Sequence, residues 1–338
     1  MTPHTFRKAT TATLLALVLA GVAGCGGRQT DTTTDTGGPV DCTITTETRV
    51  SIATGNTTGV YYTLGNAYAE QLSTATDGKL KATAAETGAS VQNIQQLVAG
   101  QYQVAFSLFD TATDAVNGTG AFTSPQPVQA LARIYDNSTH VVVRADAGIN
   151  TIADMRGKTI STGSPKSGTE VIANRLLQSA GLNPETDITP QRLDLTKSVD
   201  GMKDGSIDGL IWSGGLPTPG VTDLFTTLGA DVKFIDITPL LPKMQQINPA
   251  YRSSTIPAAT YKSAVDVPTI AVPNVLLVHD DLDANTACVL TKTLFDTKDE
   301  LIKANAAAKG INLDTARDTD PVPLNRGAAT ALDQLGAN

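Results

Sequence analysis

Short apolar runs alternate along this chain with longer amphipathic segments. The runs have the length and residue types of β-strands, and they are Val50–Ala53, Lys79–Ala84, Gln103–Leu108, Gln129–Tyr135, His140–Arg144, Lys158–Ser161, Leu210–Trp212, Lys233–Ile235 and Val275–Val278. Apolar residues recur at helical spacing over Tyr61–Leu72, Ser90–Ala99, Gly168–Ala180, Ser198–Lys203 and Asn285–Ala306. Alternating strands and helices predict the α/β class.

The length of the patterned region favours two lobes, because a body of roughly 290 residues exceeds what one hydrophobic core usually serves. One crossing between lobes is expected near His140–Ile149, and a return crossing in Tyr251–Pro273, which is rich in Pro, Ser and Ala and lacks periodicity. Residues 44–140 and 255–338 would form lobe 1, and residues 141–254 lobe 2. Two lobes joined by two crossover segments predict a central ligand cleft that closes by a hinge.

The first strand, Val50–Ala53, ends in the loop Thr54–Gly59, and a helix follows from Tyr61. Glycines let the backbone approach a ligand, and the N–H groups that start a helix favour an anion. This loop is therefore predicted to bind a small anion.

The middle of the chain repeats this design. Strand Lys158–Ser161 runs into a loop that contains Ser164, Ser167, Gly168 and Thr169, and the helix begins there. The hydroxyls could contact a ligand, or Ser and Thr could only cap the helix. The density of glycine and hydroxyl groups favours ligand contact.

Two further loops follow strands in the same way. Ser90 and Asn93 open a helix after Lys79–Ala84, and Ser107 and Asp110 close the strand Gln103–Leu108. Ligands of open α/β sheets bind at the carboxyl ends of strands. These four side chains are candidates for the cleft, although each could instead cap or decorate a helix.

Ser213, Gly214 and Gly215 follow Trp212, which is the only tryptophan of the sequence. Trp212 could wall the cleft or pack in the core, and the three residues after it are weaker candidates for ligand contact.

The N-terminal residues have the layout of a bacterial secretory signal. Arg7 and Lys8 precede the run Ala12–Ala20, and small residues lead to Cys25, as in a lipoprotein cleavage site. Residues 1–24 would be removed, Cys25 would carry lipid, and residues 25–43 would be a flexible tether. The protein would then be extracytoplasmic, anchored on the outer face of the cell membrane. The alternative is an ordinary secretion signal with an incidental cysteine.

Charge and cysteine content refine this picture. The net charge is −8, and losing Arg7 and Lys8 would make it more negative. Since no basic stripe is present, a nucleic-acid partner is excluded. Cys42 and Cys288 remain after Cys25 is assigned to lipid, and an exported chain favours a disulfide between them, although both could stay unpaired.

An enzymatic function is not supported by the sequence. His4 lies in the signal, and His140 and His279 lack metal-ligand spacing, so His140 is expected to be a packed strand residue. The chain has no Gly-x-Ser-x-Gly elbow, Walker loop or convincing carboxylate pair. We predict no catalytic residue, metal or cofactor.

Several motifs in order resemble the TAXI family, the extracytoplasmic solute receptors of TRAP transporters. The motifs lie between about Arg49 and Gly327, and they are Thr58–Tyr62, Thr87–Asn93, Gly163–Glu170, Asp204–Gly209, Ile256–Tyr261 and Val272–Asn274. One departure is Ala89-Ser90, where the family usually shows Gly-Ser.

The resemblance implies a type II periplasmic-binding-protein fold. The receptor would capture glutamate, glutamine or a 2-oxo or dicarboxylic acid and deliver it to a sodium-driven membrane subunit. Carried over by position, the site residues would be Gly59, Val60, Tyr62, Ser90, Asn93 and Ser167–Thr169. We expect a monomer.

Other interpretations stay open. A receptor for an ABC importer would share the fold, a secreted hydrolase would need a nucleophile with a base, and an adhesive surface antigen would bind no small molecule. Arg133 and Arg144 could supply countercharges for a carboxylate, but pairing at strand ends is favoured for both.

Overall fold

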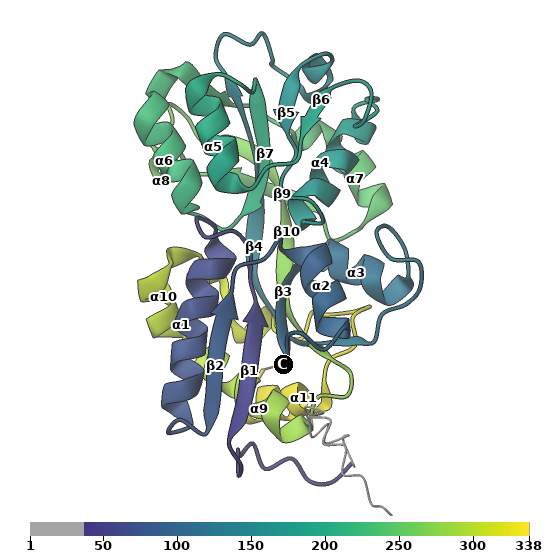
Figure 1. Ribbon diagram of the computed structural model, residues 1–338, viewed down its shortest axis with the longest axis vertical. Helices are drawn as coiled ribbons and strands as arrows, with labels where there is room; N and C mark the ends of the chain where they lie inside the picture. Colours follow the sequence, from purple (N-terminus) through teal and green to yellow (C-terminus); the bar gives the residue numbers. More distant parts are fainter. Residues whose placement is uncertain (1–36, 338) are drawn as a thin grey trace, which may run out of the picture. The chain divides into compact units, whose positions relative to one another are not determined.

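The computed structural model describes residues 37–337. Its strands form one ten-stranded sheet of order β2-β1-β3-β10-β4-β7-β5-β6, with β8 paired to β4 and β9 to β10 (Figure 1). The strands are β1 Thr48–Ala53, β2 Leu80–Ala85, β3 Val104–Leu108, β4 Val128–Arg144, β5 Thr159–Ser161, β6 Thr189–Gln191, β7 Gly209–Gly214, β8 Val232–Phe234, β9 Arg252–Ile256 and β10 Val267–His279.

Helices cover both faces of this sheet (Figure 1), which confirms the predicted α/β class. They are α1 Val60–Ala75, α2 Ser90–Val98, α3 Phe109–Asn117, α4 Gly168–Ser179, α5 Leu195–Asp204, α6 Pro219–Leu228, α7 Leu241–Ile247, α8 Ala258–Tyr261, α9 Ala284–Asp296, α10 Lys298–Ala304 and α11 Arg326–Gln334. Short 3-10 turns lie at Ile152–Met155, Gly229–Asp231, Thr238–Leu240, Ala306–Gly310 and Leu313–Thr315.

The buried apolar side chains fall into groups that define two halves of the sheet. In the first half, α1 and α9 pack on one face and α2 and α3 on the other. In the second half, α4 and α7 cover one face, and α5 and α6 the other. The predicted lobe boundaries at residues 140 and 255 stay a prediction, because β4 and β10 contribute to both halves.

The long strand β4 corrects one sequence prediction. Gln129–Tyr135 and His140–Arg144 were expected as separate strands, but the buried polar residues Asn137, Ser138 and Thr139 between them continue the strand. They do so because β4 pairs with β10 on one side and β7 on the other. Neighbouring strands thus satisfy polar groups that, in the sequence alone, indicate a break.

The segment Tyr251–Pro273 is likewise more regular than its composition indicated. It contains β9, α8 and the first part of β10, and β9 pairs with β10 over Arg252–Ile256. The predicted helix Asn285–Ala306 is divided between α9 and α10 at Thr297.

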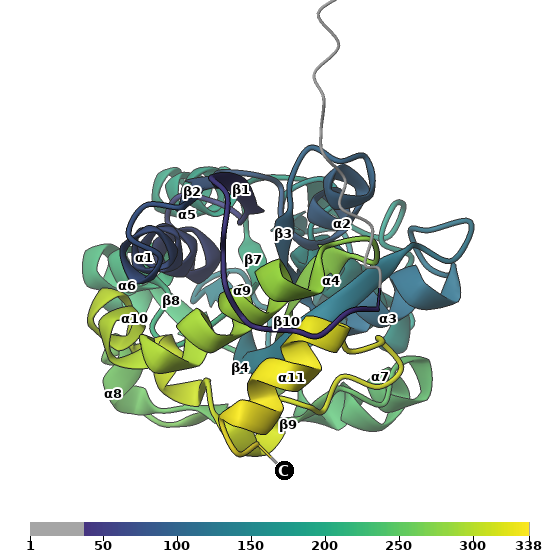
Figure 2. The ribbon, with the colours of Figure 1, turned by 90° about the horizontal axis from the view of Figure 1, so that it is seen from below.

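A disulfide joins Cys42 to Cys288 of α9, with 5.1 Å between their α-carbons. The backbone N–H of Cys42 also donates to Asn285, so the start of the body is attached to α9, which lies beside α11 (Figure 2). The predicted signal, the acylated Cys25 and tether residues 25–36 lie outside the described residues. None of the helices described between residues 37 and 337 is long and apolar enough to cross a membrane.

His140 is buried in β4, which confirms its prediction as a packed strand residue. Its Nε2 is 2.8 Å from the Tyr261 hydroxyl, and burial lowers its pKa from 6.5 to about 4. Between pH 6.5 and 4, His140 is therefore protonated in the unfolded chain but neutral in the folded protein. The free energy of unfolding falls as the pH drops through this range.

We expect His140 to make the free energy of unfolding about 2 kcal/mol lower at pH 5 than at pH 7.5. A His140→Gln variant cannot titrate, so its loss of stability over this range should be smaller by that amount. Urea unfolding at the two pH values measures the difference. Equal losses in the two proteins would contradict the prediction.

Candidate binding site

Three helices begin around one cavity between the two halves of the sheet. They are α1 and α2 of the first half and α4 of the second. The lining residues are Gly55, Asn56, Gly59, Val60, Tyr61, Gly88, Ala89, Ser90, Leu108, Asn137, Ser167, Gly168, Thr169, Trp212, Ser213 and Gly214.

The partial positive charge at the helix N-termini around this cavity is only partly balanced by side chains of the protein. Gly59 and Ala89 precede α1 and α2 without a side-chain cap, and neither first turn contains an acidic residue. In α4 the Ser167 hydroxyl accepts from the N–H of Glu170, whose own carboxylate is engaged by Lys166 N–H and Arg192. The first N–H groups of α1 and α2 are thus available to a negative ligand, whereas α4 has its own cap and an acidic residue in its first turn.

Ala89 has φ 73° and ψ −159°, a conformation that glycine adopts easily and that costs an alanine about 1–3 kcal/mol. The methyl group of this strained residue lies in the cavity wall. Ala89 stands where the TAXI family usually has the glycine of Gly-Ser. The alanine methyl therefore takes up space in the cavity that a glycine would leave open.

A network of asparagines orients the polar side of the cavity. Asn274 Nδ2 donates to the carbonyl oxygen of Tyr135 and to Asn137 Oδ1, both at 2.8 Å, and Asn274 Oδ1 accepts from the Tyr61 hydroxyl. Burial raises the pKa of Tyr61 well above its ordinary value, so the phenol keeps its proton and donates. Asn137 Oδ1 already accepts from Asn274. The side-chain nitrogen of Asn137, Nδ2, is therefore the group left to donate to a ligand.

Ser213 supplies a second free group. Its side chain is 6% exposed and lines the cavity, but its hydroxyl oxygen has no hydrogen-bond partner. A buried polar atom without a partner costs about 1–3 kcal/mol. A ligand that bonds Ser213 would recover this cost.

The two halves touch around the cavity. Asn56 of the first half donates to the Ser164 hydroxyl at 3.2 Å and accepts from the N–H of Leu195 at 3.0 Å. The N–H of Gln92 donates to the carbonyl oxygen of Lys166 at 3.0 Å. These bonds join the two halves of the sheet at the edge of the cavity.

Residues 52–336 match the sequence profile of the NMT1-like family. This chain belongs to the NMT1-like family. A solved structure from Bordetella bronchiseptica RB50 is 23% identical, with a TM-score of 0.52 over 86% of this chain and 89% of that one. A binding protein component of an ABC phosphonate transporter from Pseudomonas aeruginosa is 13% identical, with a TM-score of 0.53 over 79% and 80%. The NMT1-like chain therefore has the periplasmic-binding-protein fold.

Eight of the residues predicted from the sequence line the cavity of the NMT1-like protein. They are Gly59, Val60, Ser90, Ser167, Gly168, Thr169, Ser213 and Gly214. Ser167 combines both interpretations, because it caps α4 and also faces the cavity. The sheet brings these residues together from the loops and helix starts that follow β1, β2 and β5 and from the end of β7.

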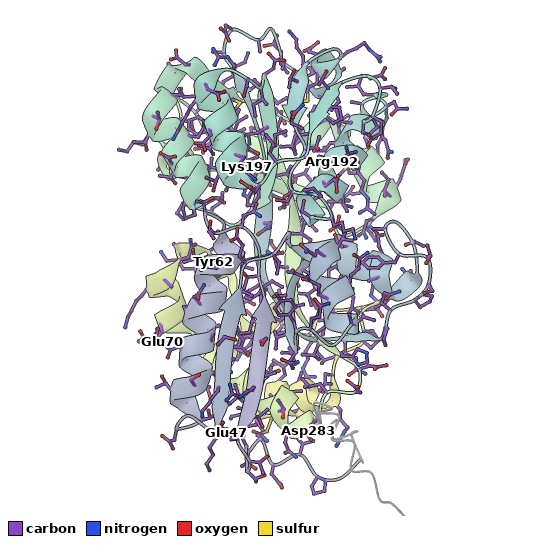
Figure 3. All side chains as sticks on the ribbon, viewed as in Figure 1. Glu47, Tyr62, Glu70, Arg192, Lys197 and Asp283 are labelled. Atoms are coloured by element: carbon purple, nitrogen blue, oxygen red, sulfur yellow. A yellow bond between two sulfur atoms is a disulfide. The ribbon has the colours of Figure 1, made fainter. Side chains whose placement is uncertain are left out.

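Six predicted residues do not line the cavity. Tyr62 is one helical step beyond Tyr61, about 100° around α1, and Figure 3 shows it near the upper end of α1. Ser164 bonds Asn56, and Gly215 packs against Tyr135.

The other three serve the fold. Asn93 donates to the carbonyl oxygens of Thr54 and Phe106 at 2.7 and 2.8 Å, which ties β1 to β3. Ser107 donates to the carbonyl oxygen of Leu108. Asp110 is buried in an ion pair with Arg175 at 2.9 Å. Each side chain is occupied by the protein and is unavailable to a ligand in the cavity.

The countercharge role considered for Arg133 and Arg144 is wrong in this structure. Arg133 pairs with Asp318 at 3.3 Å and Arg144 with Asp146 at 3.3 Å, and neither residue lines the cavity. The favoured interpretation as ion pairs is confirmed.

Sequence reasoning missed part of the lining. Gly55, Asn56, Tyr61, Gly88, Ala89, Leu108 and Asn137 were not among the predicted residues, and Trp212 was left open between wall and core. Trp212 serves both purposes, since it belongs to a buried cluster and lines the cavity. A signal for Asn56 was present, because it lies in the glycine-rich loop, but Asn137 had none, because it lies in the polar gap between two expected strands.

Proposed function

We propose that this protein is an extracytoplasmic solute receptor that encloses a small carboxylate and delivers it to a membrane transporter. The observation that carries the proposal is the convergence of three helix N-termini on an enclosed cavity in which the buried Ser213 hydroxyl has no partner. Such a site favours an anion and leaves protein donors unsatisfied without one. It offers no nucleophile with a base, so the proposed function includes no catalysis.

The proposed transporter is of the ABC type. Support comes from the shared fold with the Pseudomonas aeruginosa protein, whose description is a binding component of an ABC phosphonate transporter. A TRAP transporter of the TAXI type is the second candidate, and it is supported by motifs such as Thr87–Asn93 and Gly163–Glu170. In both cases the receptor would be held at the outer face of the membrane through lipid on Cys25.

Titration calorimetry of the full chain tests the receptor function. The ligands are glutamate, glutamine, 2-oxoglutarate, succinate and short 2-oxo monocarboxylic acids, and the amides of the 2-oxo monocarboxylic acids serve as uncharged controls. We expect at least one acid to bind and its amide to bind at least about tenfold more weakly, because the helix N-termini favour negative charge. Absence of binding across the acids would contradict the proposed function.

Uptake measurements separate the two transporter classes. The receptor is combined with the membrane proteins encoded beside it in sealed vesicles, and labelled ligand is supplied outside. Uptake that needs ATP supports the ABC type, whereas uptake that needs a sodium gradient and no ATP supports the TRAP type.

A Cys25→Ala variant that still fractionates with membranes would contradict the proposed lipid anchor.

A further inference from the structure

We propose that the cavity selects a carboxylate that carries one negative charge and no positive charge, namely a short 2-oxo or 2-hydroxy monocarboxylic acid. This inference rests on the proposed function and narrows its ligand class. It disfavours the amino acids and the dicarboxylic acids that the TAXI resemblance implies. Four features of the described lining support it.

The first feature is the charge of the wall. The lining residues include no Asp, Glu, Lys, Arg or His. A helix N-terminus corresponds to roughly half a positive charge, so the uncapped starts of α1 and α2 together compensate one carboxylate. A second carboxylate would lack a cation, and an ammonium group would lack an anion, and either group would lose its hydration on entering the closed cavity.

The second feature is the engagement of the nearest charged side chains. Lys166, in the loop before α4, donates its ammonium to Gln95 at 3.2 Å. Glu170 pairs with Arg192 at 2.7 Å. Asp110 pairs with Arg175. Glu170 and Asp110 are neutralised by arginines outside the cavity, and Lys166 is not among the lining residues, so none of the three is placed to balance a second charge on the ligand.

The third feature is the pair of free polar groups on adjacent strands. Ser213 lies on β7 opposite Thr139 of β4, two residues from Asn137. The bond from Asn274 to Asn137 Oδ1 leaves the Asn137 amide nitrogen as a donor. A donor pairs with a carbonyl or hydroxyl oxygen next to the carboxylate, but it repels an ammonium at the same carbon. This feature separates a 2-oxo acid from the amino acid of the same length.

The fourth feature is the apolar part of the wall. The side chains of Val60, Leu108 and Trp212 and the methyl of Ala89 line the same cavity. These apolar groups can pack against a short hydrocarbon chain of the ligand, but they cannot hydrogen-bond a charged group at its far end. The ligand body is therefore uncharged.

Three probes of five carbons test the inference by calorimetry on the full chain: 2-oxovalerate, norvaline and 2-oxoglutarate. They differ at one position each, because norvaline replaces the oxo group by an ammonium and 2-oxoglutarate adds a distal carboxylate. We expect 2-oxovalerate to bind at least about tenfold more tightly than either of the others.

The Asn137→Asp variant tests the role of the Asn137 amide donor in the preference for 2-oxovalerate over norvaline. Asn137→Asp keeps the shape and can still accept from Asn274, but it replaces the free amide by a carboxylate oxygen. We expect 2-oxovalerate to bind at least about tenfold more weakly and norvaline more tightly than in the wild-type protein. Asn66→Asp, an exposed site on α1, introduces the same charge outside the cavity and should leave both affinities unchanged.

The outcomes separate this inference from the proposed function. If norvaline or 2-oxoglutarate bound as tightly as 2-oxovalerate, the charge selectivity would be wrong, while the receptor function would stand. If no acid of the wider panel bound to the folded protein, both would be overturned. Should Asn137→Asp fail to fold, Ser213→Ala replaces it, and unchanged affinity for 2-oxovalerate in that variant would overturn the inference.

Discussion

Replacing Arg175 by methionine is expected to lower the free energy of unfolding by about 3–5 kcal/mol. Arg175 of α4 pairs with Asp110 at 2.9 Å and Asp114 at 2.6 Å, both on α3, and donates to the Tyr251 hydroxyl at 3.0 Å. Burial opposes the charge of Arg175, but Tyr251 and the two carboxylates together raise its pKa. Methionine would fill similar space and leave the buried carboxylate of Asp110 without a cation.

Urea unfolding at two pH values measures this effect and its cause. Without Arg175 the carboxylate of Asp114 would take up a proton more readily, so the deficit of Arg175→Met relative to wild type should shrink as the pH falls from 7 towards 4. Burial already raises the pKa of Asp114 beside Arg175. A deficit that stayed constant with pH would indicate lost packing and contradict the charge explanation.

Arg156→Met is the matched control. Arg156 pairs with Asp187 on the surface, where its side chain is 59% exposed, and exposed pairs contribute about 0–1 kcal/mol. The same substitution there should change the free energy of unfolding by no more than that amount.

Replacing Gly168 by alanine is expected to weaken ligand binding by about 5- to 150-fold, which corresponds to about 1–3 kcal/mol of overpacking. Gly168 starts α4 in the second half of the sheet. A β-carbon there would lie 2.5 Å from Leu108 Cδ1 and 2.7 Å from Ser90 Oγ, both of the first half. The added methyl would hold the halves apart and move the N–H groups of α4 away from the other two helices.

Calorimetry with 2-oxovalerate, or with whichever acid binds in the screen, measures this loss. Gly201→Ala is the matched control, because Gly201 lies inside α5 and its added β-carbon would meet only Ser206 and Ile207 of the same half, at 3.1 Å or more. We expect wild-type affinity in Gly201→Ala. If Gly168→Ala also kept wild-type affinity, Leu108 would move aside without weakening ligand binding. The proposed requirement that α4 lie close to Leu108 and Ser90 would then be wrong.

The predicted site shows where local pattern suffices. Gly59 and Ser167–Thr169 line the cavity because a glycine- or hydroxyl-rich loop between a strand and a helix places the helix N-terminus at the carboxyl edge of the sheet. Those features are local, so the sequence reports them. The correct tyrosine was missed because Tyr61 and Tyr62 are both compatible with the first turn, and only the packing of α1 on the sheet decides which one faces inward.

Asp110 shows the opposite case. Its place after β3 predicted a cleft residue, yet its carboxylate is bound by Arg175, which is 65 positions away in the chain. The partner of a buried charge is set by which helices the fold brings together, and spacing in the sequence carries no record of it. The same holds for Asn137, whose donor direction depends on Asn274 of another strand.

By itself, the sequence determined the α/β class, most strands and helices, the cavity-lining loops after β1 and β5, and the buried position of His140, because periodicity, glycine content and helix starts are properties of neighbouring residues. The tertiary structure decided the single sheet through both halves, the closed contacts of Asn56, the burial of Asp110 and the uncharged wall of the cavity. These depend on contacts between residues far apart in the chain, and hydrogen bonding and burial are settled only when those residues meet.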